Sequence, residues 1–329
     1  MRVFNQIGVV GTGNIAERHR SNIKKLIPDT KIIALSSREN YPQKKLYYAD
    51  SIAKSVDDLI EKQIDCAIVA APANLHEYFS NKFIQNGIPV LIEKPLATTI
   101  SDAKKIYMNA NKFKIPVGIG YCLRYLPSSN IVKKILSSGR LGRLFYGNVE
   151  VGHYLPDWRP DQDYLKSVSA NKELGGGVLL ELSHELDYLN WFFGPLEVIH
   201  SNLRRSSELR LDVEDCVDFS LKNDNEMNIS IHLDFLQKKP HRKCRFVGTE
   251  GVLEWDLFNH KVVLVDKKNS EVIYDKENFD LNWIYIEMLK DFINLCNQAR
   301  NILATPKDGV DVIDLIEKIK LHNLDQINK

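Results

Sequence analysis

Near the N-terminus, Ile7-Gly8-Val9-Val10-Gly11-Thr12-Gly13-Asn14-Ile15-Ala16 runs from an apolar stretch through a glycine turn into an amphipathic segment, and it decides the fold. The apolar part is typical of a buried parallel strand. The segment from about Asn14 predicts a helix whose free N–H groups point at the turn. Gly11 permits the turn, Gly13 lets the backbone approach a pyrophosphate, and the small Ala16 lets helix and strand pack closely. Against the alternative of a plain strand–turn–helix, we predict a dinucleotide site that includes Gly11, Thr12, Gly13, Asn14 and Ile15.

Length, charge and cysteine content narrow the class of protein. The 329 residues leave room for about two domains. The 44 basic and 43 acidic side chains give no electrostatic reason to expect nucleic acid or an anionic membrane as partner. No apolar stretch approaches the ~18 residues of a membrane span and the N-terminus lacks a secretion-signal pattern, so we expect a cytoplasmic protein. The five scattered cysteines predict reduced thiols and no metal site.

The first third of the chain alternates between strand and helix patterns. Strands are expected at Gln6–Val10, Lys31–Ser36, Cys66–Ala70, Pro89–Ile92 and Pro116–Gly120. Helices are expected at Asn14–Ile27, Tyr41–Tyr48, Val56–Glu61, Leu75–Asn86 and Ser101–Asn111. This alternation implies right-handed crossovers and predicts a Rossmann-type, doubly wound parallel sheet (α/β) in residues 1–123. Asn74 and Glu77 match a capping box for the helix that follows.

The pattern changes after residue 123 to longer strands in which apolar and polar residues alternate. Strands are expected at Leu144–Tyr154, Leu196–Leu203, Cys216–Leu221, Asn228–Phe235, His241–Gly248, Gly251–Asp256 and Lys261–Asp266. Helices are expected at Ser129–Ser137, Leu281–Asn297 and Val310–His322, with Gly309 just before the last of them. We therefore predict a C-terminal α+β domain in residues 124–329, built on a large, mostly antiparallel open sheet with helices on one face.

A second motif, Pro89-Val90-Leu91-Ile92-Glu93-Lys94-Pro95-Leu96, places a lysine directly after a buried strand. Ligands of open α/β sheets bind outside the carboxyl ends of the strands, so Lys94 is expected at the binding edge. Pro95 restricts Lys94 to an extended conformation and makes a cis peptide bond possible. Taken alone, the motif favours an ordinary surface lysine at a strand end.

Four features together make the chain similar to the glucose-fructose oxidoreductase/inositol dehydrogenase (Gfo/Idh/MocA) family. They are the glycine turn, Val69-Ala70-Ala71-Pro72 with His76, the Glu93-Lys94-Pro95 triplet, and Gly175-Gly176-Gly177-Val178-Leu179-Leu180-Glu181-Leu182-Ser183-His184-Glu185-Leu186-Asp187. The resemblance covers essentially the whole chain and implies an oxidoreductase that uses NAD or NADP. Beyond the glycine turn, the cofactor-binding residues expected on this basis are Ala71, Pro72, Asn74, His76, Glu93 and Lys94.

The resemblance implies that Lys94 and His184 act at the substrate. Oxidation of a secondary alcohol moves a hydride to the nicotinamide and a proton to a base. The Lys94 ammonium can stabilise charge on the alcohol oxygen, and a histidine can exchange the proton. Glu181, three residues before His184, is expected on the same helix face as a third catalytic residue. The commonest family pattern has Asp four residues before the histidine, so the role of Glu181 stays open and Asp187 is an alternative partner.

The end of the second strand bears on the choice of cofactor. It reads Ala34-Leu35-Ser36-Ser37-Arg38, with Ser37 where a carboxylate normally binds the ribose 2′-hydroxyl. A serine hydroxyl can hydrogen-bond a 2′-phosphate and a guanidinium can pair with it. We therefore predict NADP, with Ser37 and Arg38 in its site. NAD stays possible, because an arginine at this position in the family also stacks on adenine.

Candidate substrate-binding side chains lie after the fifth expected strand and in a later segment, Tyr154–Tyr164. This segment, the aromatic loop, is dense in aromatic and hydrogen-bonding groups. Two prolines in that loop favour an ordered conformation. The expected substrate-binding residues are Lys94, Arg124, Tyr154, Trp158, Arg159, Tyr164 and His184. Arg124 and Arg159 are suited to a carboxylate or phosphate, whereas for Trp158 and Tyr164 packing beneath the loop is an equal alternative. Together with the segment Leu182-Ser183-His184-Glu185-Leu186-Asp187-Tyr188, the aromatic loop is similar to a family branch associated with sugars of surface-polysaccharide biosynthesis.

The leading prediction is an NAD(P)-dependent oxidoreductase acting on a secondary alcohol or ketone of a sugar, sugar derivative or polyol, with a nucleotide sugar as one candidate. Two alternatives on the same fold are a nonenzymatic NADP-sensing regulator and a redox-assisted glycosidase. His232 and Asp234 are expected on the surface of the second sheet. The resemblance implies a homodimer or homotetramer formed through that sheet, with a small molecule rather than nucleic acid or a membrane as the other partner.

Overall fold

The computed structural model describes residues 4–40, 42 and 45–327. The chain divides into two compact units: Met1–Cys122 with Leu281–Ile313, and Leu123–Asp280 with Asp314–Lys329. The chain first passes from one unit to the other after Cys122, one residue before the boundary suggested from the sequence. Residues 281–313, which the sequence-based division assigns to the C-terminal domain, instead belong to the first unit.

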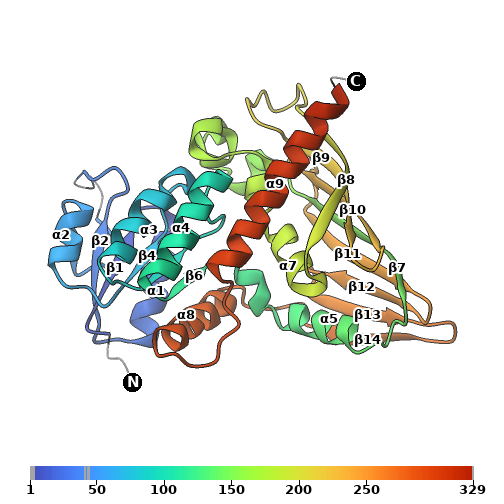
Figure 1. Cartoon of the computed structure of the whole chain (residues 1–329), viewed down its shortest axis with the longest axis horizontal. Coiled ribbons are helices and arrows are strands. Elements are labelled where there is room, and N and C mark those ends of the chain that lie inside the picture. The colour runs from blue at the N-terminus through green and yellow to red at the C-terminus, as the bar shows by residue number, and fades with distance from the viewer. Residues whose placement is uncertain (1–3, 41, 43–44, 328–329) are drawn as a thin grey trace. The chain divides into compact units, whose positions relative to one another are not determined.

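The first unit is built on a parallel sheet (Figure 1). Its strands are β1 (Gln6–Val10), β2 (Lys31–Leu35), β3 (Ser51–Ala53), β4 (Cys66–Val69), β5 (Val90–Ile92) and β6 (Val117–Ile119). Its helices are α1 (Asn14–Leu26), α2 (Val56–Glu61), α3 (His76–Gln85), α4 (Ile100–Phe113) and α8 (Asn282–Cys296). Among the described residues the strand order is β3-β2-β1-β4-β5-β6, with every neighbouring pair parallel. This confirms the predicted doubly wound Rossmann fold.

Glycine is required at the turn after β1. Gly11 has a φ of +122°, and a Cβ there would lie 2.3 Å from the Ala70 carbonyl oxygen at the end of β4. The Gly11 amide donates to the Leu35 carbonyl of β2, so three strand ends meet at this residue. Any side chain at position 11 would force these strand ends apart.

Two local predictions in the first unit are wrong, and one short strand was missed. The described residues 45–48 are not helical, although a helix was expected over Tyr41–Tyr48; Tyr41, Gln43 and Lys44 lie outside the described residues. The short strand β3 was not expected. The capping box also fails, because α3 begins at His76 after a 3-10 turn (Ala73–Leu75) with no side-chain cap, and Glu77 instead accepts a hydrogen bond from Asn81.

The second unit is built on a large sheet that is mostly antiparallel, as predicted. Its strands are β7 (Leu144–Gly152), β8 (Leu196–Arg204), β9 (Cys216–Asn223), β10 (Asn228–Asp234), β11 (His241–Gly248), β12 (Val252–Asp256), β13 (Lys261–Val265) and β14 (Ser270–Asp275). Its helices are α5 (Pro127–Ser137), α6 (Val178–Glu181) and α7 (His184–Phe193); the division between the units falls within α9 (Pro306–Ile327). In the described chain the order is β14-β13-β12-β11-β7-β10-β9-β8, and only β7 and β10 pair in parallel.

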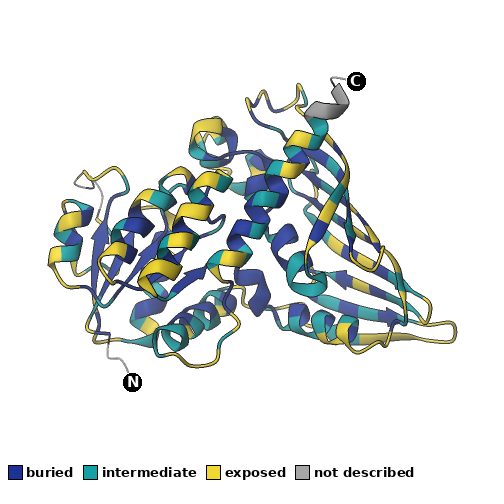
Figure 2. Ribbon diagram, in the orientation of Figure 1, coloured by how far each residue is buried: buried dark blue, intermediate teal, exposed yellow. Residues whose placement is uncertain are grey.

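Burial alternates along the strands of this second sheet (Figure 2). In β9, Val217, Phe219 and Leu221 are buried, whereas Asp218 and Ser220 are half-buried on the opposite face. Helix α5 contacts β12 and β13, and α6 contacts β9 and β10, so helices cover the apolar face. Strand β14 was missed by the sequence prediction. Gly309 does not precede the last helix, because α9 already begins at Pro306.

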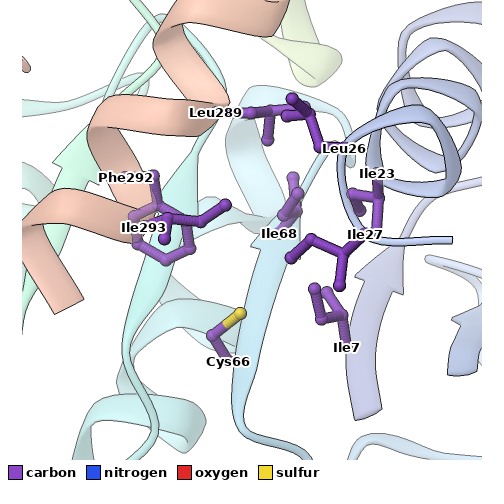
Figure 3. Close-up of a pocket in the computed structure, with 9 residues that line it drawn as sticks. All are labelled: Ile7, Ile23, Leu26, Ile27, Cys66, Ile68, Leu289, Phe292 and Ile293. Atoms are coloured by element: carbon purple, nitrogen blue, oxygen red, sulfur yellow. The ribbon is translucent and has the colours of Figure 1, made fainter. Parts of the chain in front are cut away.

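Space inside the first unit is filled by apolar side chains. A small pocket lies between α1, β1, β4 and α8 (Figure 3), with only about 10 Å³ available. It is lined by Ile7, Ile23, Leu26, Ile27, Cys66, Ile68, Leu289, Phe292 and Ile293. Such a volume holds one water at most, so this is core packing and not a ligand site. None of the described helices has both the length and the apolar character needed to cross a membrane.

Candidate functional site

The carboxyl end of β1 has the features of a dinucleotide cradle. Thr12, Gly13 and Asn14 are exposed, and Gly13 is the N-cap of α1 with no side-chain cap. A Cβ at Gly13 would have no neighbour within 4 Å, so the space over this residue is open. The first N–H groups of the 13-residue helix therefore remain available for an anion. The residues present fit the diphosphate of a dinucleotide.

In the loop after β2, the first carboxylate, that of Glu39, is engaged in a structural contact. Ser36 donates to the Asn40 side chain and accepts from the Arg38 amide, which orders the turn. Ser37 is half-buried and Arg38 is exposed. The Glu39 carboxylate accepts the Val56 amide at 3.0 Å, at the N-terminus of α2. The first acidic side chain after β2 thus stabilises a helix start, which sequence reasoning did not foresee.

His76 links two of the turns at this edge of the sheet. Its ring nitrogens lie 2.9 Å from the Ala71 carbonyl, after β4, and 2.9 Å from the Pro95 carbonyl, after β5. The side chain is buried, and burial lowers the pKa of His76. Both ring nitrogens thus face backbone oxygens, and a contact of His76 with the cofactor stays a prediction. Pro72 and Asn74 lie in the same turn region before α3, and their cofactor role stays a prediction.

The Glu93-Lys94-Pro95 triplet follows β5 directly. Lys94 is half-buried, and its peptide bond to Pro95 is cis. Glu93 is buried and lies 2.6 Å from the Nε2 atom of His19, which is on α1. Sequence reasoning missed His19; the available signal was its place in the helix of the glycine motif, four residues after Ile15. Lys94 belongs to the same unit and the same sheet edge as the glycine turn.

His184 lies in the second unit, at the first position of α7. Glu181 ends the separate short helix α6, and Leu182 and Ser183 interrupt the helix between them. The prediction that Glu181 and His184 share one face of a single helix is therefore wrong. The Glu181 carboxylate accepts the Ser169 hydroxyl at 3.0 Å.

Arg124 and Asp187 form a buried ion pair. Arg124 Nε and Nη2 donate to the two Asp187 carboxylate oxygens at 3.0 and 2.7 Å. The Arg124 side chain is only 4% exposed and that of Asp187 only 2%. This corrects one expectation: Arg124 holds Asp187 instead of presenting an open site for a substrate anion. Asp187 as a partner of His184 stays a prediction.

The aromatic loop is ordered by its own contacts. The Trp158 indole donates to the His153 carbonyl and packs edge-on against Phe235. The Tyr164 hydroxyl donates to the Leu209 carbonyl. Both contacts match the alternative of packing beneath the loop. Lys238 Nζ lies 3.1 Å from the centroid of the Tyr154 ring, and Arg159 is exposed. Substrate binding by these four loop residues stays a prediction.

A cluster of metal-type ligands lies on β9 and β10. Donor atoms of Cys216, Asp218 and His232 lie within 4.8 Å of one another. Each is already hydrogen-bonded: His232 binds Asp218 and Asp234 through its two nitrogens, and Arg204 donates to Cys216 and Asp218. Hydrogen bonds from His232, first to Asp234 and then to Asp218, raise the pKa of His232 to about 9. The cluster is therefore a network of paired charges. Of the two residues expected on the sheet surface, Asp234 is buried and His232 is half-buried.

Comparisons with known proteins place this geometry in a family. Residues 5–121 match the model of an oxidoreductase family with an NAD-binding Rossmann fold, and residues 130–254 match the GFO/IDH/MocA C-terminal domain. An uncharacterized oxidoreductase of Synechocystis is 28% identical over 202 residues, which are 60% of this chain and 53% of that protein. Inositol 2-dehydrogenase 2 of Saccharopolyspora erythraea is 25% identical over 236 residues, 69% of this chain and 66% of that protein.

A solved structure shows the same fold over nearly the full length. The WlbA dehydrogenase from Bordetella pertussis, in complex with NADH and UDP-GlcNAcA, superposes with a TM-score of 0.82 at 20% identity and covers 98% of each chain. The chain therefore belongs to the Gfo/Idh/MocA family of oxidoreductases with an NAD-binding Rossmann fold.

Proposed function

We propose that the chain is an NAD(P)-dependent oxidoreductase that acts on a secondary alcohol or ketone of a sugar, sugar derivative or polyol. The position of Lys94 carries the proposal. It is half-buried directly after β5, and parallel strands bring the carboxyl ends of β1 and β5 to the same edge. A lysine at the edge that holds the dinucleotide cradle is in position to act on a substrate beside the cofactor.

The chemistry follows from the residue types. A bound nicotinamide supplies or accepts the hydride. The Lys94 ammonium donates a hydrogen bond to the substrate oxygen and stabilises the negative charge that develops there. His184, the first residue of α7, exchanges the hydroxyl proton. Arg159 remains the arginine assigned to a substrate anion, because the Arg124 guanidinium is engaged by Asp187.

The proposed cofactor is NADP, with NAD as the alternative. Glu39 is engaged by the α2 N-terminus, which supports a site without a carboxylate at the ribose 2′ position. Ser37 and the exposed Arg38 would meet a 2′-phosphate there. The relative that binds NADH in its solved structure is the reason to keep NAD as the competing outcome.

The substrate class is proposed from the relatives. One is named for inositol, and another was solved with the nucleotide sugar UDP-GlcNAcA. A nucleotide sugar of surface-polysaccharide biosynthesis would suit the aromatic loop and Arg159. We also propose a cytoplasmic homodimer or homotetramer formed through the polar face of the second sheet, opposite the apolar face that α5 and α6 contact.

The test is a pair of fluorescence titrations of nucleotide-stripped protein with NADPH and NADH, followed by a turnover screen. The screen uses polyols, free sugars and nucleotide sugars, with nicotinamide absorbance as readout. We expect NADPH to bind at least tenfold more tightly, about 1.4 kcal/mol, and turnover with one of these classes. Tighter NADH binding would overturn the cofactor assignment. Binding of either nucleotide with no turnover on any class would favour a nucleotide-sensing regulator instead.

A further inference from the structure

His19 makes a short, buried contact to Glu93 of the Glu93-Lys94-Pro95 triplet. It lies on α1, one turn beyond the residues of the glycine turn, and its side chain is fully buried. The His19 Nε2 atom is 2.6 Å from the Glu93 carboxylate, whose side chain is 10% exposed. The contact therefore joins the cradle helix to the residue immediately before Lys94.

The surroundings of His19 indicate where its proton lies. The Nδ1 atom is buried and has no hydrogen-bond partner among the residues that the structure describes. A ring with its proton on Nε2 leaves Nδ1 as a bare acceptor, whereas a proton on Nδ1 would be an unsatisfied buried donor. A proton on Nε2 thus fits the site best, and Nε2–H donates a hydrogen bond to the Glu93 carboxylate.

The Glu93 carboxylate is enclosed on its other sides. Its second oxygen accepts the backbone N–H of Lys94 at 3.3 Å. A Cβ at Gly120, after β6, would lie 3.0 Å from that oxygen, so the absence of a side chain there leaves room for the carboxylate. Tyr285 of α8 meets the His19 ring edge-on at 6.3 Å between centroids, and the Arg18 guanidinium covers the Tyr285 ring. The carboxylate therefore has one well-defined orientation.

We propose that His19 is a positioning residue: through the Glu93 carboxylate it fixes the backbone from which the Lys94 side chain projects. This inference rests on the proposed function, in which the Lys94 ammonium must meet the substrate oxygen. A displacement of about 1 Å of a catalytic group can cost about 100-fold in rate. His19 itself touches neither substrate nor cofactor, and its effect passes through Glu93.

The test compares two substitutions of similar size. His19→Leu removes the donor, and His19→Gln keeps an N–H that can reach Glu93. We expect His19→Leu to lower kcat about 100-fold with NADPH affinity within about threefold of wild type, and His19→Gln to recover at least tenfold of that loss. His200→Leu, at an exposed histidine of β8, is the control and should leave kcat unchanged. If His19→Leu loses thermal stability but keeps kcat within threefold of wild type, His19 is only structural and the proposal is wrong.

Two further measurements keep the result decisive. Should His19→Leu fail to fold, Glu93→Gln replaces it and must lower kcat at least tenfold further than His19→Gln does; equal kcat values for these two variants would overturn the proposal. For a readout that needs no substrate, lysines are reductively methylated with ¹³C and the Lys94 resonance is assigned with Lys94→Arg. It should shift in His19→Leu and stay near its wild-type position in His19→Gln. An unshifted resonance would reject the positioning role, whereas absent turnover in wild type would reject only the proposed function.

Discussion

At the scale of single residues, burial distinguishes charged side chains that stabilise the fold from charged side chains that are available for catalysis. Arg124 and Asp187 neutralise each other in the interior, where an unpaired charge is costly. Sequence reasoning identified both as chemistry-bearing residues but could not pair them, because they are 63 positions apart and meet only in the folded unit. Lys94 could be assigned from sequence because the buried strand before it fixes its place at the sheet edge. His19 could not, because its role depends on its contact with Glu93.

The network around His232 predicts a pH-dependent stability. Its pKa rises from the usual 6.5 to about 9 in the folded state. The folded state therefore binds this proton more tightly, and the stabilisation is fully present below pH 6.5 and lost as the pH rises through 9. We expect a loss of about 1 kcal/mol across this range, after allowing for solvent screening at a half-buried site.

Urea unfolding of wild type and His232→Gln, measured from pH 6 to 10, checks this prediction. The difference in unfolding free energy between the two proteins should shrink as the pH rises. A difference independent of pH would show that His232 is neutral in the folded protein.

At the scale of elements, regular patterns were predictable and irregular ones were not. The apolar strands β1 and β4 and the amphipathic helix α1 were found within one residue at each end. Strand β14 was missed because its residues are exposed or half-buried, so they carry no apolar alternation. The break between α6 and α7 was missed because Leu182 and Ser183 include neither glycine nor proline.

The two glycines of the β1–α1 turn should respond differently to alanine. Gly13→Ala meets no protein atom, so the unfolding free energy should stay within about 0.5 kcal/mol of wild type. NADPH affinity should nevertheless fall, because the added methyl group occupies the open space where a diphosphate approaches. Gly11→Ala should destabilise the fold by more than 1 kcal/mol, because its Cβ would strike the Ala70 carbonyl.

Urea unfolding and nucleotide titration of both variants test this contrast. Unchanged NADPH affinity in Gly13→Ala would mean that the diphosphate does not bind over this turn.

At the scale of the whole molecule, the C-terminal part of the chain completes the N-terminal unit. Helix α8 packs on α1, and the Asn22 and Asn282 amides exchange hydrogen bonds across 260 positions of sequence. The helix itself was predictable from its apolar period, but the unit it joins was not, because that depends on contacts distant in sequence. The predicted doubly wound and antiparallel sheets, in contrast, follow from local patterns.

Phe292 of α8 should therefore behave as a core residue of the N-terminal unit. It is 2% exposed and lines the apolar pocket beside Ile68 of β4 (Figure 3). Phe292→Ala should cost about 3–4 kcal/mol of unfolding free energy. The matched control on the same helix is Trp283→Ala, where the side chain is 40% exposed and a loss below about 1.5 kcal/mol is expected. Equal losses in the two variants would argue against α8 as part of this core.

Hydride transfer at a centre that includes Lys94 can be tested with the substitution Lys94→Ala. The turnover of Lys94→Ala is measured on the substrate class found in the screen. The control is Lys104→Ala, which replaces an exposed lysine of α4. We expect at least a 100-fold loss of kcat in Lys94→Ala, with NADPH affinity retained and Lys104→Ala like wild type. If Lys94→Ala instead turns over at the wild-type rate, Lys94 is not catalytic and the proposed mechanism is wrong.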